Sequence, residues 1–192
     1  MKEKVKAYIE SIKDELITLS HNIHANPEIS FTEYKSSAFI VEVLRNHGFE
    51  VEYPYANIET AFKATKKGKG EGPKIAILAE YDALPEIGHA CGHNVIATCS
   101  TGAFLALSEI MDNYDGEIAI IGTPAEEGGG GKIHILNNGG FDGYEYALMM
   151  HPSSGERGLV NRGGRAATSV YVEFFGKAVH SSAPAHGINA LN

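Results

Sequence analysis

Five side chains with metal-binding or acid–base chemistry follow three apolar segments of the sequence. They are Cys91 and His93, the adjacent pair Glu126-Glu127, and His151. Thiolates, imidazoles and carboxylates are the groups that bind zinc-like cations in proteins. If the apolar segments are neighbouring strands of one sheet, these side chains meet at its edge. The sequence therefore predicts a metal-dependent hydrolytic site.

The adjacent carboxylates Glu126 and Glu127 indicate what such a site could do. Neighbouring residues of an extended segment point to opposite sides of the backbone. One carboxylate can therefore bind a metal while the other accepts a proton from a metal-bound water. The alternative is a pair of solvated carboxylates on a loop. It is less favoured, because Pro124 and the glycines at 128–131 are typical of a defined turn.

The elements that must position these groups follow from the apolar pattern. Uninterrupted apolar runs predict buried strands at residues 74–79, 117–122 and 146–150. Helices are expected at 94–111 and 131–137. Strands that alternate with helices and with Gly- or Pro-rich turns are the signature of an α/β domain. Ligands bind at the carboxyl ends of such strands, which is where the five side chains fall.

The pattern also predicts the elements that flank this alternation. Apolar residues at three- and four-residue steps predict one amphipathic helix over residues 2–25. Thr32 is expected to cap a second helix, and Asn94 is expected to cap the helix that follows it. Strands are expected at 49–53 and 60–65, where β-branched and aromatic residues are frequent.

A change of pattern near Gly163-Gly164 predicts a domain boundary. Residues 168–175 alternate apolar and polar side chains, as a strand with one buried face does. We therefore expect a metal-binding catalytic domain over residues 1–163. Residues 164–192 would be the incomplete start of a second domain, because so short a segment cannot hold a core of its own.

Composition and charge exclude several classes of protein. The formal net charge of −8 argues against a nucleic-acid partner, since such proteins carry a clustered basic face. No apolar run reaches the ~18 residues that a membrane span needs. The amino terminus also lacks the apolar core of a signal peptide. Cys91 and Cys99 do not make a disulfide framework, which favours a reducing compartment. We expect a cytoplasmic protein with no membrane partner.

Five groups of residues carry a resemblance that runs over the whole chain. They are His21-Asn22-Ile23-His24 with Pro27-Glu28, Tyr81-Asp82-Ala83-Leu84-Pro85, Gly88-His89-Ala90-Cys91-Gly92-His93, Pro124-Ala125-Glu126-Glu127-Gly128-Gly129, and Gly176-Lys177-Ala178-Val179-His180. By these motifs the chain resembles the dinuclear metal-dependent amidohydrolases and peptidases, a family that includes aminoacylases, N-acyl-amino-acid hydrolases and aminobenzoyl-glutamate hydrolase. The resemblance implies an α/β fold: a three-layer, zinc-peptidase-like catalytic domain, followed by the first strand and part of a small α+β lid or dimerisation domain.

The resemblance also implies a metal site. Its ligands would be Cys91, His93, Glu127 and His151, with Cys91 shared between up to two ions per subunit. Thiolate and imidazole ligands favour Zn²⁺, whereas the carboxylates keep Mn²⁺ as an alternative.

Further roles follow from the same resemblance. Glu126 would be the general base that later protonates the leaving amine. Asp82 would contact the metal ligands without binding the metal itself. His180 lies on the lid domain. It would reach the site of the partner subunit in a homodimer and steady the carbonyl or carboxylate of the substrate. The other histidines of the motifs are expected to be structural: His21, His24 and His89.

The sequence departs from the family pattern in two respects. Asn94 and Glu80 stand where many relatives carry Asp. Relatives are also longer, because they return from the lid to the catalytic domain and bring a further His ligand there. Nothing in the setting of His186 argues that it replaces this ligand.

The expected function is hydrolysis of amide bonds in N-acyl amino acids or small dipeptide-like substrates. One alternative is a metal-binding fragment or assembly partner of the same fold with an incomplete catalytic site. A second alternative is a cysteine hydrolase with Cys91 as nucleophile and His93 as base. That alternative is less favoured, because it leaves two glutamates and a third histidine without a role.

Overall fold

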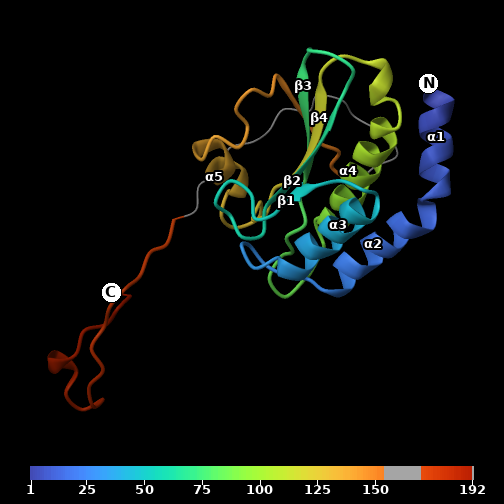
Figure 1. The fold of residues 1–192 in the computed structure, drawn as a ribbon. Helices are drawn as coiled ribbons and strands as arrows, with labels where there is room; N and C mark the ends of the chain where they lie inside the picture. Colours follow the sequence, from blue (N-terminus) through green and yellow to red (C-terminus); the bar gives the residue numbers. More distant parts are fainter. Residues whose placement is uncertain (154–169, 192) are drawn as a thin grey trace. The chain divides into compact units, whose positions relative to one another are not determined.

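The computed structural model describes residues 1–153 and 170–191 (Figure 1). The chain divides into two units, Met1–Ser154 and Gly155–Asn192. The predicted boundary at residues 163–164 lies outside the described residues, so the division into 1–163 and 164–192 stays a prediction.

A five-stranded mixed sheet forms the centre of the first unit, with strand order β1-β2-β4-β3-β5 (Figure 1). The strands are β1 (Val51–Glu52), β2 (Phe62–Lys67), β3 (Lys74–Ala79), β4 (Glu117–Gly122) and β5 (Tyr146–Leu148). Strand β3 runs parallel to both β4 and β5, whereas β2 is antiparallel to β1 and β4. The carboxyl ends of β3, β4 and β5 therefore meet at one edge, as the sequence predicts.

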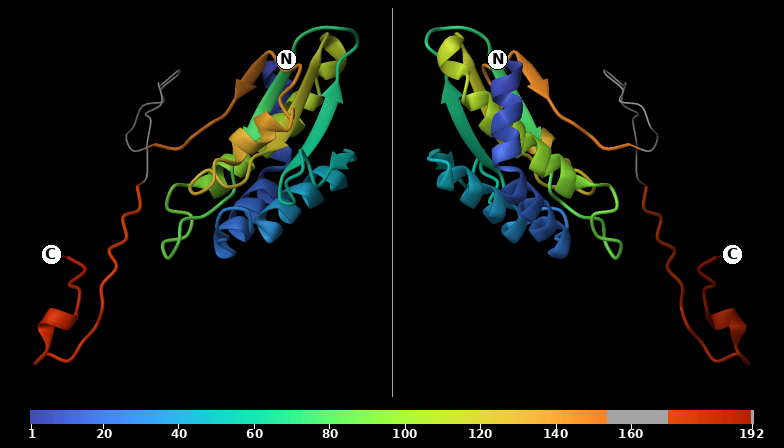
Figure 2. Two further views of the ribbon diagram at one scale, coloured as in Figure 1. Left: turned by 90° about the vertical axis from the view of Figure 1, so that its left-hand side faces the viewer. Right: turned by 90° about the vertical axis from the view of Figure 1, so that its right-hand side faces the viewer.

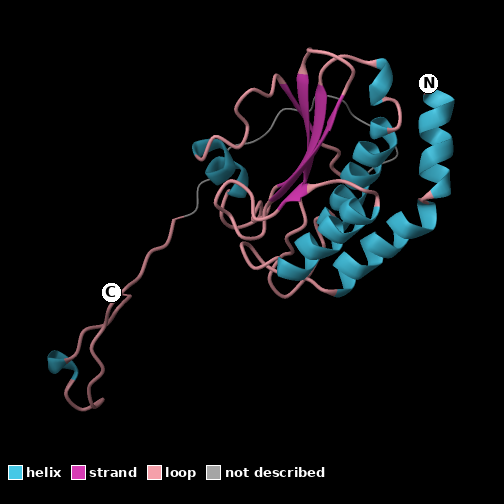
Figure 3. Ribbon diagram, viewed as in Figure 1, coloured by secondary structure: helices cyan, strands magenta, loops and turns pink. Residues whose placement is uncertain are grey.

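Helices cover both faces of this sheet (Figure 2). The helices of this unit are α1 (Lys2–Ser11), α2 (Lys13–Ala25), α3 (Tyr34–Asn46), α4 (His93–Ser108) and α5 (Gly131–Asn137), with a short 3₁₀ turn η1 (Met111–Asn113). A second 3₁₀ turn, η2 (Pro184–His186), belongs to the second unit. Helices α2, α3 and α4 share one core with the sheet, and α5 contributes Ile135 to a second core on the other face (Figure 3). Strand β3 contributes side chains to both cores, because Ile77 lies in the first and Ala76 in the second.

The predicted single helix over residues 2–25 is wrong, because α1 and α2 are separate helices that meet at Ile12. Ile12 has φ −106° and ψ 9°, outside the helical region. The Ser11 hydroxyl donates to the Tyr8 carbonyl at 2.6 Å, so this side chain competes for a helix acceptor at the break. Figure 1 shows that α1 turns away from the direction of α2. An apolar period does not reveal such a break.

The predicted cap at Thr32 is also wrong. Its hydroxyl donates to the Ile29 carbonyl, and α3 begins at Tyr34. The carboxylate of Glu28 instead accepts the free N–H groups of Lys35 and Ser36 at 2.9–3.1 Å. An acidic group at a helix amino terminus also stabilises the helix dipole. Glu28 therefore fixes the start of α3 from outside the helix.

The burial predicted for residues 146–150 is wrong, although β5 forms within this range. Tyr146 and Leu148 are 59% and 60% exposed. Strand β5 is the last strand of the sheet and pairs only with β3 in the described part of the chain. An apolar run has the same local pattern in the middle of a sheet and at its edge, so the sequence could not distinguish the two.

The described part of the second unit, residues 170–191, contains little regular structure. Residues 170–175 form no strand, and the prediction for residues 168 and 169 lies outside the described range. Val172 and Phe174 are largely exposed. Lys177 and Ile188 form an isolated antiparallel bridge. Among the described residues, no strand pairs with residues 170–175, and a strand without a neighbour cannot satisfy its backbone groups, which accounts for the difference from the expected strand.

No helix within the described ranges is both long enough and apolar enough to cross a membrane.

Candidate metal centre

Helix α4 begins at His93, directly at the carboxyl edge of the sheet. Gly92 precedes it in the left-handed conformation (φ +83°), and a Cβ at this position would lie 2.7 Å from Pro152 Cγ. Only glycine permits both features without strain. The predicted cap at Asn94 is wrong, because this residue lies inside the helix and its side chain donates to Ser20 Oγ at 3.0 Å. Gly92 thus brings the start of α4 next to the segment after β5.

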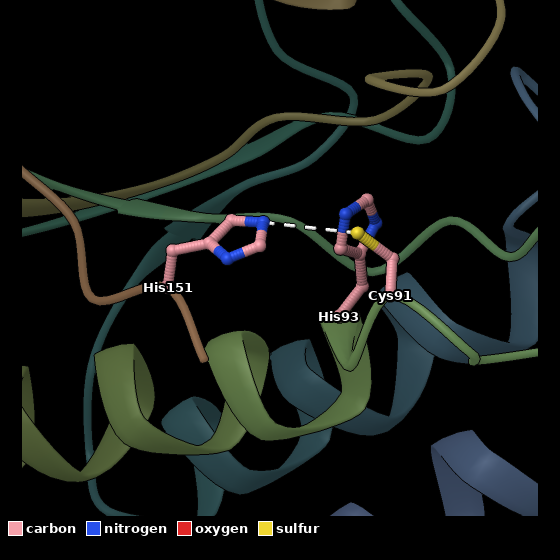
Figure 4. A group of neighbouring side chains, drawn as sticks. All are labelled: Cys91, His93 and His151. Carbon is pink, nitrogen blue, oxygen red and sulfur yellow. Dashed lines mark hydrogen bonds between the residues drawn. The ribbon is translucent and has the colours of Figure 1, made fainter. Parts of the chain in front are cut away.

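Three of the four predicted ligands lie together: Cys91, His93 and His151 (Figure 4). One ligand atom from each lies within 4.8 Å of the others. Cys91 Sγ is 3.7 Å from His151 Nε2. The rings of His93 and His151 are nearly perpendicular, with centroids 6.3 Å apart.

The carboxylates of the turn after β4 approach the same histidine. His93 Nε2 lies 3.7 Å from Glu127 Oε1 and 3.8 Å from Glu126 Oε2. A third carboxylate, Glu80, places Oε2 3.4 Å from His93 Nε2. Glu80, His93 and Glu126 form a second group whose ligand atoms lie within 4.8 Å of one another. The sequence prediction did not place Glu80 in the site.

Asp82 orients both His93 and Glu127. Its Oδ1 accepts the Nδ1–H of His93 at 3.0 Å, and its Oδ2 accepts the backbone N–H of Glu127 at 2.9 Å. Burial raises the pKa of Asp82, but these hydrogen bonds outweigh burial and lower the pKa below its ordinary value. Burial lowers the pKa of His93, but the carboxylates of Asp82, Glu80 and Glu127 outweigh burial and raise it, so they favour a positive charge at this point. In the neutral imidazole with the proton on Nδ1, Nε2 presents its lone pair to the site. Carboxylate–histidine pairs of this kind orient metal ligands.

Three buried atoms at this point have no hydrogen-bond partner in the described part of the chain: Glu80 Oε2, His93 Nε2 and Glu127 Oε1. Buried polar atoms are normally paired, and unpaired ones are costly. All three are acceptors when His93 is neutral, so they repel one another unless a positive charge lies between them. A divalent cation supplies that charge, and imidazole, carboxylate and thiolate donors suit a zinc-like ion. The residues present therefore fit a metal.

The surroundings of Cys91 disfavour the cysteine-hydrolase alternative. Burial and the neighbouring carboxylate of Glu127 raise the pKa of the Cys91 thiol to about 12. A thiol in this state is a poor nucleophile, because the thiolate is the reactive form. The acidic groups that penalise a free thiolate attract a cation instead.

Glu126 is an accessible carboxylate with a raised pKa. Burial and the negative charge of Glu80 raise the pKa of Glu126, and Lys132 partly offsets this effect. Its side chain is 44% exposed, so water and small molecules can reach it. A carboxylate whose pKa is raised toward neutrality accepts a proton more effectively.

Glu33 holds the turn that carries the two glutamates, a role for which the sequence gives no local sign. It is fully buried, and its Oε1 accepts the backbone N–H of Ala125 at 2.8 Å and that of Phe31 at 3.0 Å. Its Oε2 accepts the Thr60 hydroxyl at 3.0 Å. Ala125 has a positive φ of 59°, so the hydrogen bond helps to hold a strained residue in place. Ninety-two positions separate Glu33 from Ala125, and no periodicity connects them.

The remaining predicted residues lie apart from this cluster or in the other unit. His180 belongs to the second unit, where its Nδ1 lies 2.8 Å from Ser182 Oγ, and its predicted role stays a prediction. His186 lies in η2 of the same unit. His89 is buried with its ring 6.2 Å from that of His24.

Comparison with known proteins identifies the family. The profile of peptidase family M20/M25/M40 matches residues 76–186, which is more than half of the chain. The chain is 33% identical to the Xaa-Arg dipeptidase of Mus musculus, over 100% of this chain and 47% of the relative. It is 31% identical to the N-acetyl-L-cysteine deacetylase of Bacillus subtilis, over 95% of this chain and 48% of the relative.

A further relative is a subunit of the p-aminobenzoyl-glutamate hydrolase of Escherichia coli, 32% identical over 96% of this chain and 42% of the relative. The chain spans about half the length of the curated relatives it matches.

Solved structures agree with this assignment. A putative aminohydrolase from methicillin-resistant Staphylococcus aureus aligns with a TM-score of 0.69 and 28% identity, over 77% of this chain and 41% of that chain. The YXEP protein of Bacillus subtilis, a dinuclear metal binding peptidase from the M20 family, aligns with the same TM-score and identity over 75% of this chain and 44% of that chain. The family match, the shared fold and the order of the motifs agree, and the chain belongs to peptidase family M20/M25/M40.

Proposed function

We propose that this chain carries the catalytic core of a metal-dependent hydrolase that cleaves amide bonds in N-acyl amino acids or small dipeptide-like molecules. The observation that carries the proposal is the set of three unpartnered buried atoms around His93 Nε2, found within the described part of the chain next to the accessible carboxylate of Glu126. Relatives named as a dipeptidase, a deacetylase and an aminobenzoyl-glutamate hydrolase support this substrate class.

In this proposal, Cys91, His93, Glu127 and His151 hold the cation. When bound, the cation would polarise the substrate carbonyl and acidify water. Glu126 would accept a proton from a water molecule at its carboxylate and return the proton to the leaving amine.

Zn²⁺ is the proposed ion, with Mn²⁺ as the alternative and up to two ions per subunit. The Cys91 thiolate and the two imidazoles favour zinc, and the carboxylates suit manganese. Cys91 is the ligand proposed to be shared between two ions, as the family resemblance implies, and its Sγ lies 3.7 Å from His151 Nε2 (Figure 4).

His180 and the segment 164–192 have proposed roles that rest on the family resemblance. His180 would steady the substrate carbonyl or carboxylate in the site of a partner subunit, within a homodimer formed through this segment. We also propose a cytoplasmic location, which the two free cysteines, Cys91 and Cys99, support. The net charge of −8 supports the proposal that nucleic acid is not a partner.

A turnover assay on the metal-free and metal-loaded chain tests the proposal. The chain is stripped with a chelator, reloaded with Zn²⁺ or Mn²⁺, and given a panel of N-acyl amino acids and dipeptides. We expect hydrolysis that disappears on stripping, returns on reloading, and falls strongly in Glu126→Gln, which keeps the shape of the side chain. Activity that survives the chelator but disappears in Cys91→Ser would instead support the cysteine-hydrolase alternative.

A second candidate is a metal-binding chain of this fold whose catalytic site is completed by further polypeptide. Two observations favour it: the chain spans 42–48% of the relatives named above, and the parallel edge strand β5 is exposed. Parallel strands are normally covered on both faces. Bound metal without hydrolysis, with no difference between wild type and Glu126→Gln, would favour this candidate.

A further inference from the structure

Glu80 is a buried carboxylate at the carboxyl end of the central parallel strand. It follows β3 directly and is 2% exposed. Strand β3 lies between β4 and β5, so Glu80 lies between the turn that carries Glu127 and the segment that carries His151. A buried carboxylate is costly unless a positive charge compensates it.

The two oxygens of Glu80 have different surroundings. Oε1 forms an ion pair with Lys132 Nζ of α5. Oε2 has no hydrogen-bond partner among the described residues and lies 3.4 Å from His93 Nε2. Lys132 thus compensates one oxygen and leaves the other directed at the histidine.

In the neutral imidazole, the contact between Glu80 Oε2 and His93 Nε2 joins two acceptors. Asp82 accepts the Nδ1–H of His93, which leaves a lone pair on Nε2 in the neutral imidazole. Glu126 completes a group of three ligand atoms within 4.8 Å of one another, and two of its three residues are buried. A divalent cation satisfies all of these acceptors together, whereas an ion pair with Lys132 alone satisfies only Oε1.

We propose that Glu80 is an additional ligand of the cation bound at His93, through Oε2, and that Lys132 retains Oε1 and so limits Glu80 to one bond. This inference rests on the proposed metal-dependent function. An extra carboxylate makes the ligand set harder, which raises the affinity for Mn²⁺ relative to Zn²⁺. Glu80 is thereby a determinant of metal preference.

Calorimetric titration of the metal-free chain with Zn²⁺ and with Mn²⁺ tests this role. We expect Glu80→Gln to weaken Mn²⁺ binding by about tenfold or more and Zn²⁺ binding less. Lys132→Met should weaken the binding of neither ion, because Oε2 remains and Oε1 is released. Glu52→Gln is the matched control, since Glu52 pairs with Lys63 at 3.2 Å on the β1–β2 side of the sheet. It should bind both ions as the wild type does.

The outcomes separate the inference from the function on which it rests. A wild type that binds no metal overturns both. A wild type that binds metal, with Glu80→Gln indistinguishable from Glu52→Gln, overturns the role of Glu80 alone. Equal losses in Glu80→Gln and Lys132→Met also overturn it, because they indicate an ion pair that only supports the fold.

A second measurement uses the wild type and does not depend on the folding of a variant. Anomalous diffraction from Mn²⁺-soaked crystals locates the ion. An anomalous peak at roughly 2.0–2.2 Å from Glu80 Oε2 supports the inference. A peak at His93 with Glu80 bound only to Lys132 overturns it.

Discussion

The two sides of the candidate metal centre differ in how firmly the fold holds them. On the inner side, His93 and Asp82 are buried and hydrogen-bonded to each other, and Asp82 also binds the backbone of Glu127. On the outer side, Cys91 and His151 are less covered, and within the described ranges the His151 ring is hydrogen-bonded only to the Pro152 carbonyl and to the Cys91 sulfur. The candidate ligands on the inner side are therefore oriented without a cation, whereas a cation would have to fix those on the outer side.

Removing one histidine from each side should give the largest difference. We expect His93→Ala to weaken Zn²⁺ binding by more than about 100-fold. Loss of a residue that only hydrogen-bonds to a metal ligand costs about 10–100-fold, and loss of the ligand itself should cost more. His151→Ala should cost less, because an exposed side chain loses more freedom when it binds the ion. Calorimetric titration of both variants measures the two affinities. A larger loss of Zn²⁺ affinity in His151→Ala than in His93→Ala would show that the inner side does not dominate binding.

The hydrogen bonds of Asp82 should give the next largest effect. In Asp82→Asn, the amide oxygen can still accept from His93, but the amide N–H₂ then faces the backbone N–H of Glu127. We expect the Zn²⁺ affinity to fall by about 10–100-fold. Asp112→Asn is the matched control, since Asp112 pairs with Lys66 at 3.3 Å and is largely exposed. Equal affinities of the two variants would show that the inner side is not oriented by Asp82.

Substitution of Glu33 tests whether its buried carboxylate fixes the turn after β4. Glu33→Ala leaves the buried N–H of Ala125 without an acceptor and should lower the free energy of unfolding by about 1–3 kcal/mol. Glu33→Gln keeps a carbonyl acceptor in the same place. We expect Glu33→Ala, and not Glu33→Gln, also to weaken Zn²⁺ binding. Thermal and denaturant unfolding together with metal titration measure these effects.

The difference in stability between Glu33→Gln and wild type should change with pH in one direction. Burial raises the pKa of Glu33 above its ordinary value of 4.5, and its hydrogen bonds only partly offset this. The folded state therefore favours the protonated carboxyl. This contribution to stability is fully present below the ordinary pKa and is lost as the pH rises through the raised pKa. The stability of Glu33→Gln relative to wild type should increase over that range. If the difference in the free energy of unfolding between the two proteins did not change with pH, the pKa of Glu33 would not be raised by burial.

The smallest effect is expected in the second unit. Val172 and Phe174 are largely exposed, so Val172→Ser and Phe174→Ser should change the free energy of unfolding by no more than about 0.5 kcal/mol. Ile120 of β4 is fully buried, and Ile120→Ala should cost about 2–5 kcal/mol. Denaturant unfolding of the three variants measures the contrast. A large loss in Phe174→Ser would show that this segment is covered by the rest of the protein.

Local sequence patterns predicted the elements that position the site more accurately than the elements around it. The strands at 74–79 and 117–122 and the helix at 131–137 have the predicted bounds, because turn residues delimit each segment. The break at Ile12 and the exposure of β5 were not predictable. Each depends on what the segment contacts and not on its own pattern.

The residues of the candidate site were likewise predictable only where local sequence patterns identified them. Cys91, His93 and Glu127 could be selected because their types and the strand ends pointed to one edge of the sheet. Glu80 also follows a predicted strand, but nothing in the sequence marked it as a ligand, and Glu33 could not be selected, because a single glutamate carries no sign of burial. Their contacts, to Lys132 and Ala125, join segments that are 52 and 92 positions apart.

The metal content of the purified chain tests the central claim most directly. Elemental analysis of wild type, after exposure to Zn²⁺ and removal of unbound ions, should find at least one ion per chain, and the same treatment of His93→Ala should find none. A wild type without metal under these conditions would contradict the claim that the buried acceptors around His93 form a cation site.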